Sequence, residues 1–182
     1  KSGRDPSWNA QKSWSLAGDG ASFSIDTINP LHENNRHFAV FAIQNQGAAL
    51  VNEGFAGIPV RQGEKYNFSV FAKSLEGEKG SLLVRLTSES GEILAEGKTK
   101  KIIGNWKKYE FQITANKSFG KAKLEVIPQF TGKVALDMIS LFPQNTFNQR
   151  KNGLRADLAQ AIADLHPRFV RFPGGCVAHG DG

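Results

Sequence analysis

The chain has 182 residues, of which 40% are hydrophobic and 22% are charged, and its formal net charge is +6. This is the composition of an ordinary globular protein, and no apolar run approaches the roughly 20 residues that span a bilayer, so we expect no membrane partner. The single cysteine, Cys176, excludes an internal disulfide and a cysteine-based zinc site, and the four histidines show no ligand spacing. We therefore predict no metal and no cofactor.

The basic residues are scattered along the chain, with short clusters only at Lys98, Lys100 and Lys101 and at Lys107 and Lys108. An excess of positive charge can indicate binding to nucleic acid or to an anionic surface. Scattered lysines are more typical of solvated strand faces, so we expect no nucleic-acid partner.

From about residue 21 to residue 142, short apolar and alternating segments are separated by turn signals. The pattern favours an antiparallel β-sandwich, and about nine or ten strands with glycine-rich turns fit a jelly-roll better than a seven-stranded immunoglobulin domain. After a first strand around Phe23 and Ile25, the expected strands are 37–44, 64–74, 81–88, 92–96, 106–114, 121–130 and 133–142. On this basis residues 1–143 form the sandwich and residues 144–150 a polar linker.

Residues 151–182 have a different pattern. The spacing of the apolar residues predicts an amphipathic helix, with Asn152 capping its start and His166-Pro167 ending it. The stripe consists of Leu154, Leu158, Ala161, Ile162 and Leu165. An apolar strand over 168–172 and a Gly174-Gly175 loop follow. Helix, strand and glycine-rich loop in this order are typical of an α/β unit, and one such unit cannot bury both faces of its strand. We therefore interpret 151–182 as part of a second domain.

The segment 154–182, LRADLAQAIADLHPRFVRFPGGCVAHGDG, resembles part of the α-L-arabinofuranosidases of glycoside hydrolase family 51, above all in its RFPGGC motif at 171–176. Upstream, 51–74, 104–115 and 136–142 resemble the galactose-binding-like jelly-roll, similar to a carbohydrate-binding module, of many of these enzymes. The resemblance implies that the jelly-roll is inserted between early elements of a (β/α)8 catalytic barrel, or TIM barrel, whose second strand is 168–172.

The resemblance also implies an activity, the removal of terminal arabinofuranosyl residues from arabinan or arabinoxylan with retention of configuration. Retaining glycosidases need two carboxyl groups about 5–5.5 Å apart. The resemblance implies that both glutamates follow later barrel strands, so we expect no catalytic residue in this chain. Asp181 is the only acid just past the expected barrel strand, and we interpret it as a loop residue.

Four residues of the motif are expected at the substrate. The resemblance implies that Gly174, Gly175 and Cys176 line an incomplete arabinofuranose pocket and that Arg171 braces the strand end. The alternative is a tight turn that merely ends a strand. No histidine is placed to make Cys176 a catalytic thiol, but an exposed Cys176 allows an intermolecular disulfide. We expect 151–182 to be poorly ordered, or to pack against the sandwich or a second copy of the chain.

The sandwich offers few aromatic residues for stacking on sugar rings. Trp8 and Trp14 lie in a polar stretch and either stack on sugar or pack against the sandwich edge. Phe55, beside Gly54 and Gly57, is a third candidate, whereas the core-like neighbours of Trp106 favour a structural role. Asn34, Asn35 and His37 are candidates for polar contacts to a sugar, but turn chemistry explains the two asparagines equally well.

Without a cluster of exposed aromatics, the sequence slightly favours a structural role for the sandwich over polysaccharide binding. A stand-alone carbohydrate-binding or adhesion module is the remaining alternative. Jelly-rolls of this type often hold calcium through an acid such as Asp137 on the last strand, but the sequence shows no companion ligands. The resemblance favours secretion or a periplasmic location in a bacterium.

Overall fold

The computed structural model describes residues 11–170, which belong to two compact units divided between Pro143 and Gln144. We call the first the sandwich unit and the second the C-terminal unit. Among the described residues, no helix has the length and apolar character needed to cross a membrane.

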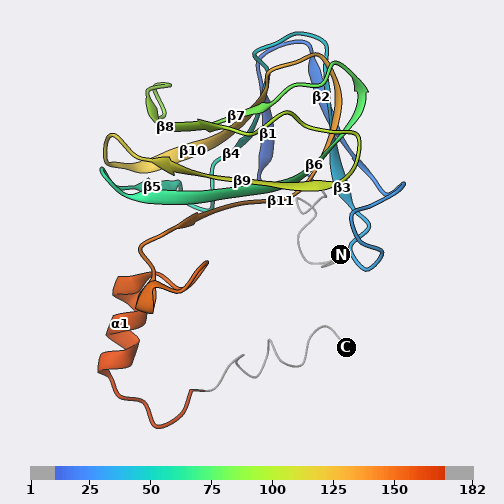
Figure 1. Cartoon of the computed structure of the whole chain (residues 1–182). Coiled ribbons are helices and arrows are strands. Elements are labelled where there is room, and N and C mark those ends of the chain that lie inside the picture. Colours follow the sequence, from blue (N-terminus) through green and yellow to red (C-terminus); the bar gives the residue numbers. More distant parts are fainter. Residues whose placement is uncertain (1–10, 171–182) are drawn as a thin grey trace. The chain divides into compact units, whose positions relative to one another are not determined.

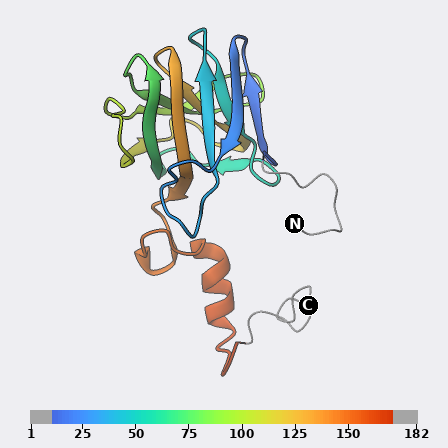
Figure 2. The ribbon, with the colours of Figure 1, turned by 90° about the vertical axis from the view of Figure 1, so that its right-hand side faces the viewer.

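The sandwich unit consists of two facing antiparallel sheets (Figures 1 and 2). One sheet has the strand order β1 (Trp14–Ala17), β4 (Ala49–Asn52), β10 (Phe119–Pro128), β7 (Leu82–Thr87) and β8 (Ile93–Lys98), and β5 (Ile58–Val60) also pairs with β10. The other has the order β2 (Ala21–Asp26), β3 (Phe38–Ile43), β11 (Gly132–Pro143), β6 (Lys65–Gly77) and β9 (Lys107–Thr114). The predicted antiparallel sandwich is confirmed.

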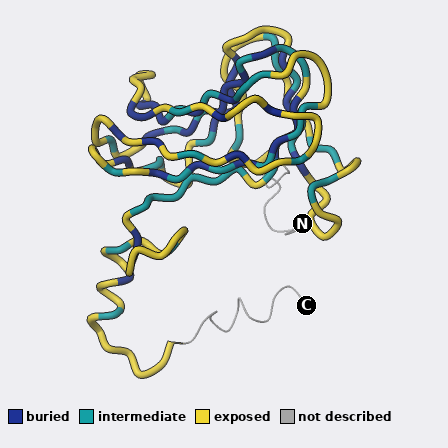
Figure 3. The backbone as a smooth tube through the Cα atoms, in the orientation of Figure 1, coloured by how far each residue is buried: buried dark blue, intermediate teal, exposed yellow. Residues whose placement is uncertain are grey.

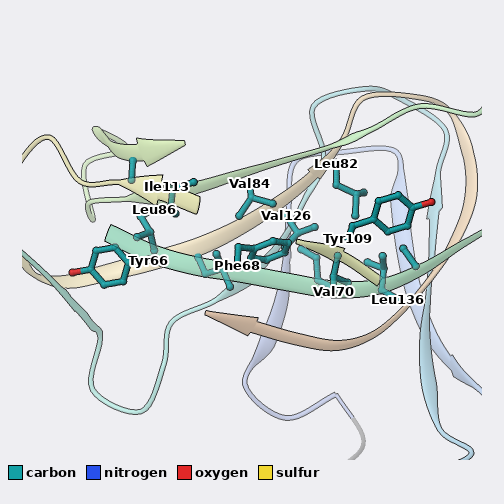
Figure 4. Close-up of a cluster of buried hydrophobic side chains, with 14 of the residues drawn as sticks. Tyr66, Phe68, Val70, Leu82, Val84, Leu86, Tyr109, Ile113, Val126 and Leu136 are labelled. Atoms are coloured by element: carbon teal, nitrogen blue, oxygen red, sulfur yellow. The ribbon is translucent and has the colours of Figure 1, made fainter. Parts of the chain in front are cut away.

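The core lies between the two sheets and is built from alternate residues of the long strands (Figure 4). Along β6 the side chains of Tyr66, Phe68, Val70 and Ala72 are buried, as the alternation predicts. The Phe68 ring packs on Phe111 of β9 with 5.1 Å between the ring centroids. Full burial of a side chain as large as Phe68 contributes about 1.5–3 kcal/mol.

Three short strands were not predicted: β1, β4 and β5. Trp14, in a stretch that the sequence characterises only as polar, is the first residue of β1. β4 lies between β1 and β10, and Ala49, Leu50 and Val51 are all buried, so both of its faces are covered and it shows no alternation. A buried run of four residues carries too little periodicity to be distinguished from other apolar segments.

The C-terminal unit contains a 3₁₀ turn, η1 (Phe147–Gln149), and one helix, α1 (Ala156–Asp164). The predicted cap at Asn152 is wrong, because the helix starts later and the residue at its N-cap is Arg155. Asn152 instead has a left-handed backbone, with φ of 55°, in the turn that precedes the helix. The Arg155 guanidinium pairs with Asp157 at 2.7 Å, and this hydrogen bond lowers the pKa of Asp157 to about 2.

The apolar stripe of the helix is not buried (Figure 3). Leu158 and Ile162 are 56% and 55% exposed, and within α1 only Ala159 is buried. Residues 168–170 of the predicted strand 168–172 are not in a strand, since no other strand among the described residues pairs with them, and the rest of that strand lies outside the described part.

Candidate functional site

The most exposed aromatic ring in the described part of the chain is Phe55, in the loop between β4 and β5. Its exposure is 107%, so neither face of the ring is covered. The loop itself is held by hydrogen bonds. The Asn52 side chain accepts from the Gly54 N–H at 2.9 Å and donates to the Ser13 carbonyl at 3.1 Å, and the Gly57 N–H donates to the Glu53 carbonyl at 3.1 Å.

The end of this loop lies close against β10. Gly57 has φ of +88°, and a Cβ at this position would lie 2.5 Å from the Cα of Lys121. Glycine is therefore required both by the backbone angle and by the available space. The Asx turn at Asn52 and the close approach at Gly57 fix the loop ends, so Phe55 projects from a preorganised loop.

Charged groups flank the Phe55 loop. The carboxylate of Glu53 pairs with the Nζ of Lys123 at 2.8 Å, and this hydrogen bond raises the pKa of Lys123. Both side chains are partly exposed, which leaves lone pairs and N–H groups for other partners. Phe55 follows Glu53 of this ion pair by two residues along the chain. An uncovered aromatic ring can stack on the C–H face of a sugar ring, and a carboxylate and an ammonium group can bind sugar hydroxyls.

The other aromatic candidates differ from Phe55. Trp14 is half-buried and packs against the main core, which is the second of the two alternatives the sequence allows. Trp8 lies outside the described residues, and so do Arg171, Gly174, Gly175 and Cys176. The roles of these five residues stay predictions.

Trp106 is part of a packed cluster at the start of β9. Its Nε1 donates to the Asn29 carbonyl at 3.0 Å, and its ring meets Phe38 edge-on with 5.3 Å between centroids. The Nζ of Lys73 lies 4.9 Å from the Trp106 ring centroid and donates to the same carbonyl at 3.1 Å. These contacts agree with the predicted structural role.

Two of the polar candidates after β2, Asn34 and Asn35, belong to a turn. The Asn35 N–H donates to the His32 carbonyl at 3.1 Å, and the Asn34 N–H donates to the His32 Nδ1 at 3.1 Å. Asn34, Asn35 and His37 are exposed. The two asparagines thus serve the turn that their residue type suggests.

Asp137 lies in β11 next to a register shift in its pairing with β6. Its Oδ1 accepts from the Met138 N–H at 2.7 Å, whereas its Oδ2 is buried without a partner, and burial raises the pKa of the carboxyl group. Residues 11–170 contain no group of three His, Cys, Asp or Glu side chains able to hold a metal ion.

Comparison with known proteins relates this fold to a family. Residues 9–133 match the model of a family described as a carbohydrate binding domain. The chain belongs to this family. The chain also shares its two-sheet fold with a CBM4 domain at a TM-score of 0.53 and 14% sequence identity, covering 72% of this chain and 94% of that one.

The chain as a whole is also homologous to part of larger proteins. It is 38% identical over 174 residues to an extracellular exo-α-L-arabinofuranosidase of Streptomyces chartreusis, covering 95% of this chain and 20% of that protein. It is 30% identical over 180 residues to α-L-arabinofuranosidase 2 of Arabidopsis thaliana, covering 92% of this chain and 26% of that one.

A solved structure gives the same relationship. An arabinose-bound GH51 α-L-arabinofuranosidase superposes with a TM-score of 0.82 at 27% identity, covering 90% of this chain and 28% of that one. The chain therefore spans 20–28% of the length of these three arabinofuranosidases. The resemblance to family 51 arabinofuranosidases is confirmed.

Sequence reasoning selected Phe55 but missed the residues around it in the carbohydrate-binding domain. Asn52 carries a weak signal, because Asn-Glu-Gly at 52–54 is typical of an Asx turn. Lys123 carries none, since its position beside Glu53 follows from the pairing of β4 with β10.

Proposed function

We propose that this chain supplies the sugar-binding sandwich and the first part of the catalytic domain of a secreted α-L-arabinofuranosidase. The parent enzyme removes terminal arabinofuranosyl residues from arabinan or arabinoxylan with retention of configuration. The homology to arabinofuranosidases supports this function, and the name of the Streptomyces relative supports an extracellular location. In this proposal the sandwich is a galactose-binding-like jelly-roll, and the C-terminal unit is part of a (β/α)8 barrel.

The uncovered helix supports the idea that the C-terminal unit is incomplete. A stripe of apolar side chains on α1 and just beyond it is more than half exposed, namely Leu158, Ile162, Leu165, Phe169 and Val170. Each side chain of this size gains about 1.5–3 kcal/mol from full burial, so an uncovered stripe favours packing in a larger domain. Arg171, Gly174, Gly175 and Cys176 would then line the arabinofuranose pocket of that domain.

Activity measurements test the enzyme assignment. A longer protein that contains this sequence together with a whole barrel is expected to release arabinose from p-nitrophenyl α-L-arabinofuranoside and from arabinan. The 182-residue chain is expected to release none, because the resemblance places both catalytic glutamates elsewhere. Release of arabinose by the short chain, or inactivity of the folded longer protein on both substrates, would overturn the assignment.

The observation that carries the sugar-binding role of the sandwich is the uncovered ring of Phe55 on a loop held by hydrogen bonds. A rigid loop loses little conformational freedom when a ligand binds, so one stacked ring retains more of its interaction free energy. Glu53 and Lys123 would accept and donate hydrogen bonds to the hydroxyls of the same arabinofuranosyl residue.

Chemical-shift mapping locates this site directly. Arabino-oligosaccharides added to the ¹⁵N-labelled chain are expected to shift the amide signals of residues 52–57 and of Lys123. Shifts confined to the 27–37 loop, or to the face of either sheet, would place sugar binding elsewhere and refute the role of Phe55.

A structural role is the second candidate for the sandwich. It is favoured by the contacts of Trp14 and Trp106, because both rings are used in packing and do not form a stacking platform. In this case Phe55 would be an anchor for packing against the rest of the protein, and sugar titration would leave the signals of its loop unchanged.

A further inference from the structure

A second exposed surface, distant in sequence from the Phe55 loop, is strongly basic. It consists of Lys79, Lys98, Lys100, Lys101 and Lys107, which we call the lysine patch. Lys98 ends β8, Lys107 begins β9, and Lys100 and Lys101 lie in the connection between these strands. All five side chains are exposed.

Backbone hydrogen bonds bring these residues to one end of the sandwich. The Thr99 N–H donates to the Leu82 carbonyl at 2.9 Å, and the Ile102 N–H donates to the Gly80 carbonyl at 2.7 Å. The connection between β8 and β9 therefore runs beside the start of β7, which places Lys100 and Lys101 next to Lys79. Lys98 pairs with Leu83, and Lys107 with Ala72.

The connection that carries the patch is anchored in the core. Ile102 is fully buried, and the Tyr109 hydroxyl accepts from the Ile103 N–H at 3.0 Å. The buried Thr99 accepts from the Leu82 N–H at 2.9 Å through its hydroxyl. The backbone that presents these lysines is thus fixed before any ligand arrives.

The lysines of the patch differ from four other surface lysines in having no carboxylate partner among the described residues. Lys108, Lys117, Lys123 and Lys133 each form an ion pair with a glutamate. None of the five patch lysines has such a partner among the described residues. One acidic residue without an ion pair, Glu78, is adjacent in sequence to Lys79. The five lysines together with Glu78 carry a local charge of +4, against a formal net charge of +6 for the whole chain.

We propose that the lysine patch binds the carboxylates of a uronate-bearing polysaccharide. A fixed group of unpaired ammonium ions attracts a polyanion, and each lysine acts as a point charge that tolerates carboxylates at varied spacing. The five patch residues are all lysines, so the patch offers point charges and no bidentate guanidinium fork. The proposal rests on the polysaccharide-binding role of the sandwich and adds an acidic polymer to its ligands.

Binding of polygalacturonate tests the proposal. Its affinity for the 182-residue chain is measured in calcium-free buffer at low and at 0.3 M salt, with neutral arabinan and double-stranded DNA as comparison ligands. The test variant is Lys100→Gln with Lys101→Gln, and the matched control is Lys65→Gln with Lys117→Gln, which lowers the net charge equally on exposed residues outside the patch.

The patch variant is expected to lose at least fivefold in affinity for polygalacturonate and the control less than twofold, and salt is expected to weaken the wild-type interaction. Equal losses in both variants, no binding of polygalacturonate at low salt, or tighter binding of DNA would overturn the proposal. Neutral arabino-oligosaccharides report on the Phe55 loop separately. Their binding is expected to be unchanged in the patch variant, so failure of one site is distinguishable from failure of the other.

Discussion

Replacement of Trp106 separates a packing role from a ligand-binding role for this aromatic ring. In Trp106→Phe the hydrogen bond to the Asn29 carbonyl is lost, which costs about 0.5–1.5 kcal/mol. The interaction with the Lys73 ammonium weakens as well, and such contacts contribute about 0.5–1 kcal/mol at exposed sites. The expected loss in the free energy of unfolding is therefore about 1–2 kcal/mol.

Trp106→Ala also removes the edge-on contact with Phe38, which contributes about 0.5–1.5 kcal/mol beyond buried area. Because Trp106 is only half-buried, we expect a total loss of about 3 kcal/mol, at the lower end of the range for buried tryptophan. Urea unfolding followed by circular dichroism measures both values.

A double-mutant cycle identifies the source of the loss. Lys73→Met removes the partner above the ring, so its effect and that of Trp106→Phe are expected to be non-additive by at least 0.5 kcal/mol, as is typical of residues in contact. A loss below 0.5 kcal/mol for Trp106→Ala, together with loss of arabino-oligosaccharide binding, would refute the packing role.

Three further predictions concern ionisation and backbone strain. Desolvation by burial raises the pKa of Tyr66 to about 12. The unfolded chain therefore ionises at lower pH than the folded chain, and stability is lost between pH 10 and pH 12. In an absorbance titration at 295 nm, the Tyr66 transition should have its midpoint near pH 12 and should be absent from Tyr66→Phe. Burial also raises the pKa of Asp137, so the free energy of unfolding falls as the pH rises through that pKa. Asp137→Asn should therefore raise the free energy of unfolding at pH 7 but not at pH 3. No gain at pH 7 would contradict this prediction. At Gly132, where φ is +126°, a Cβ would overlap the Glu76 carbonyl, so Gly132→Ala should lower the free energy of unfolding in urea by about 2–3 kcal/mol. The control is Gly91→Ala, where φ is +83° and space is open, with an expected loss of about 1 kcal/mol. Equal losses would show that the overlap at Gly132 is relieved.

The long strands could be predicted from the sequence because each has one buried face. Tyr66, Phe68 and Val70 alternate with less buried residues along β6, and this period survives in the structure. The strand β4, with Ala49, Leu50 and Val51, was missed because it is buried on both faces. The strand β1, which begins at Trp14, was missed because four residues cover hardly two periods of the alternation.

The helix and the site were predictable only in part. The apolar spacing located α1, but Asn152 was given a capping role that it does not have, since asparagine suits a left-handed turn as well as an N-cap. Phe55 stood out beside two glycines, whereas the pairing of Glu53 with Lys123 joins residues 70 positions apart, and no local pattern encodes it.

Calorimetric titration of the chain with arabino-oligosaccharides tests the sugar-binding role of the sandwich most directly. We expect saturable heat with the wild-type chain. In Phe55→Ala the affinity for the oligosaccharide is expected to fall at least tenfold, which is equivalent to about 1.4 kcal/mol of binding free energy. The same heat should persist in Ile28→Ala, which removes another exposed apolar side chain from a different loop. No saturable heat up to millimolar ligand, or equal affinity of wild type and Phe55→Ala, would contradict this role and leave the sandwich with a structural role only.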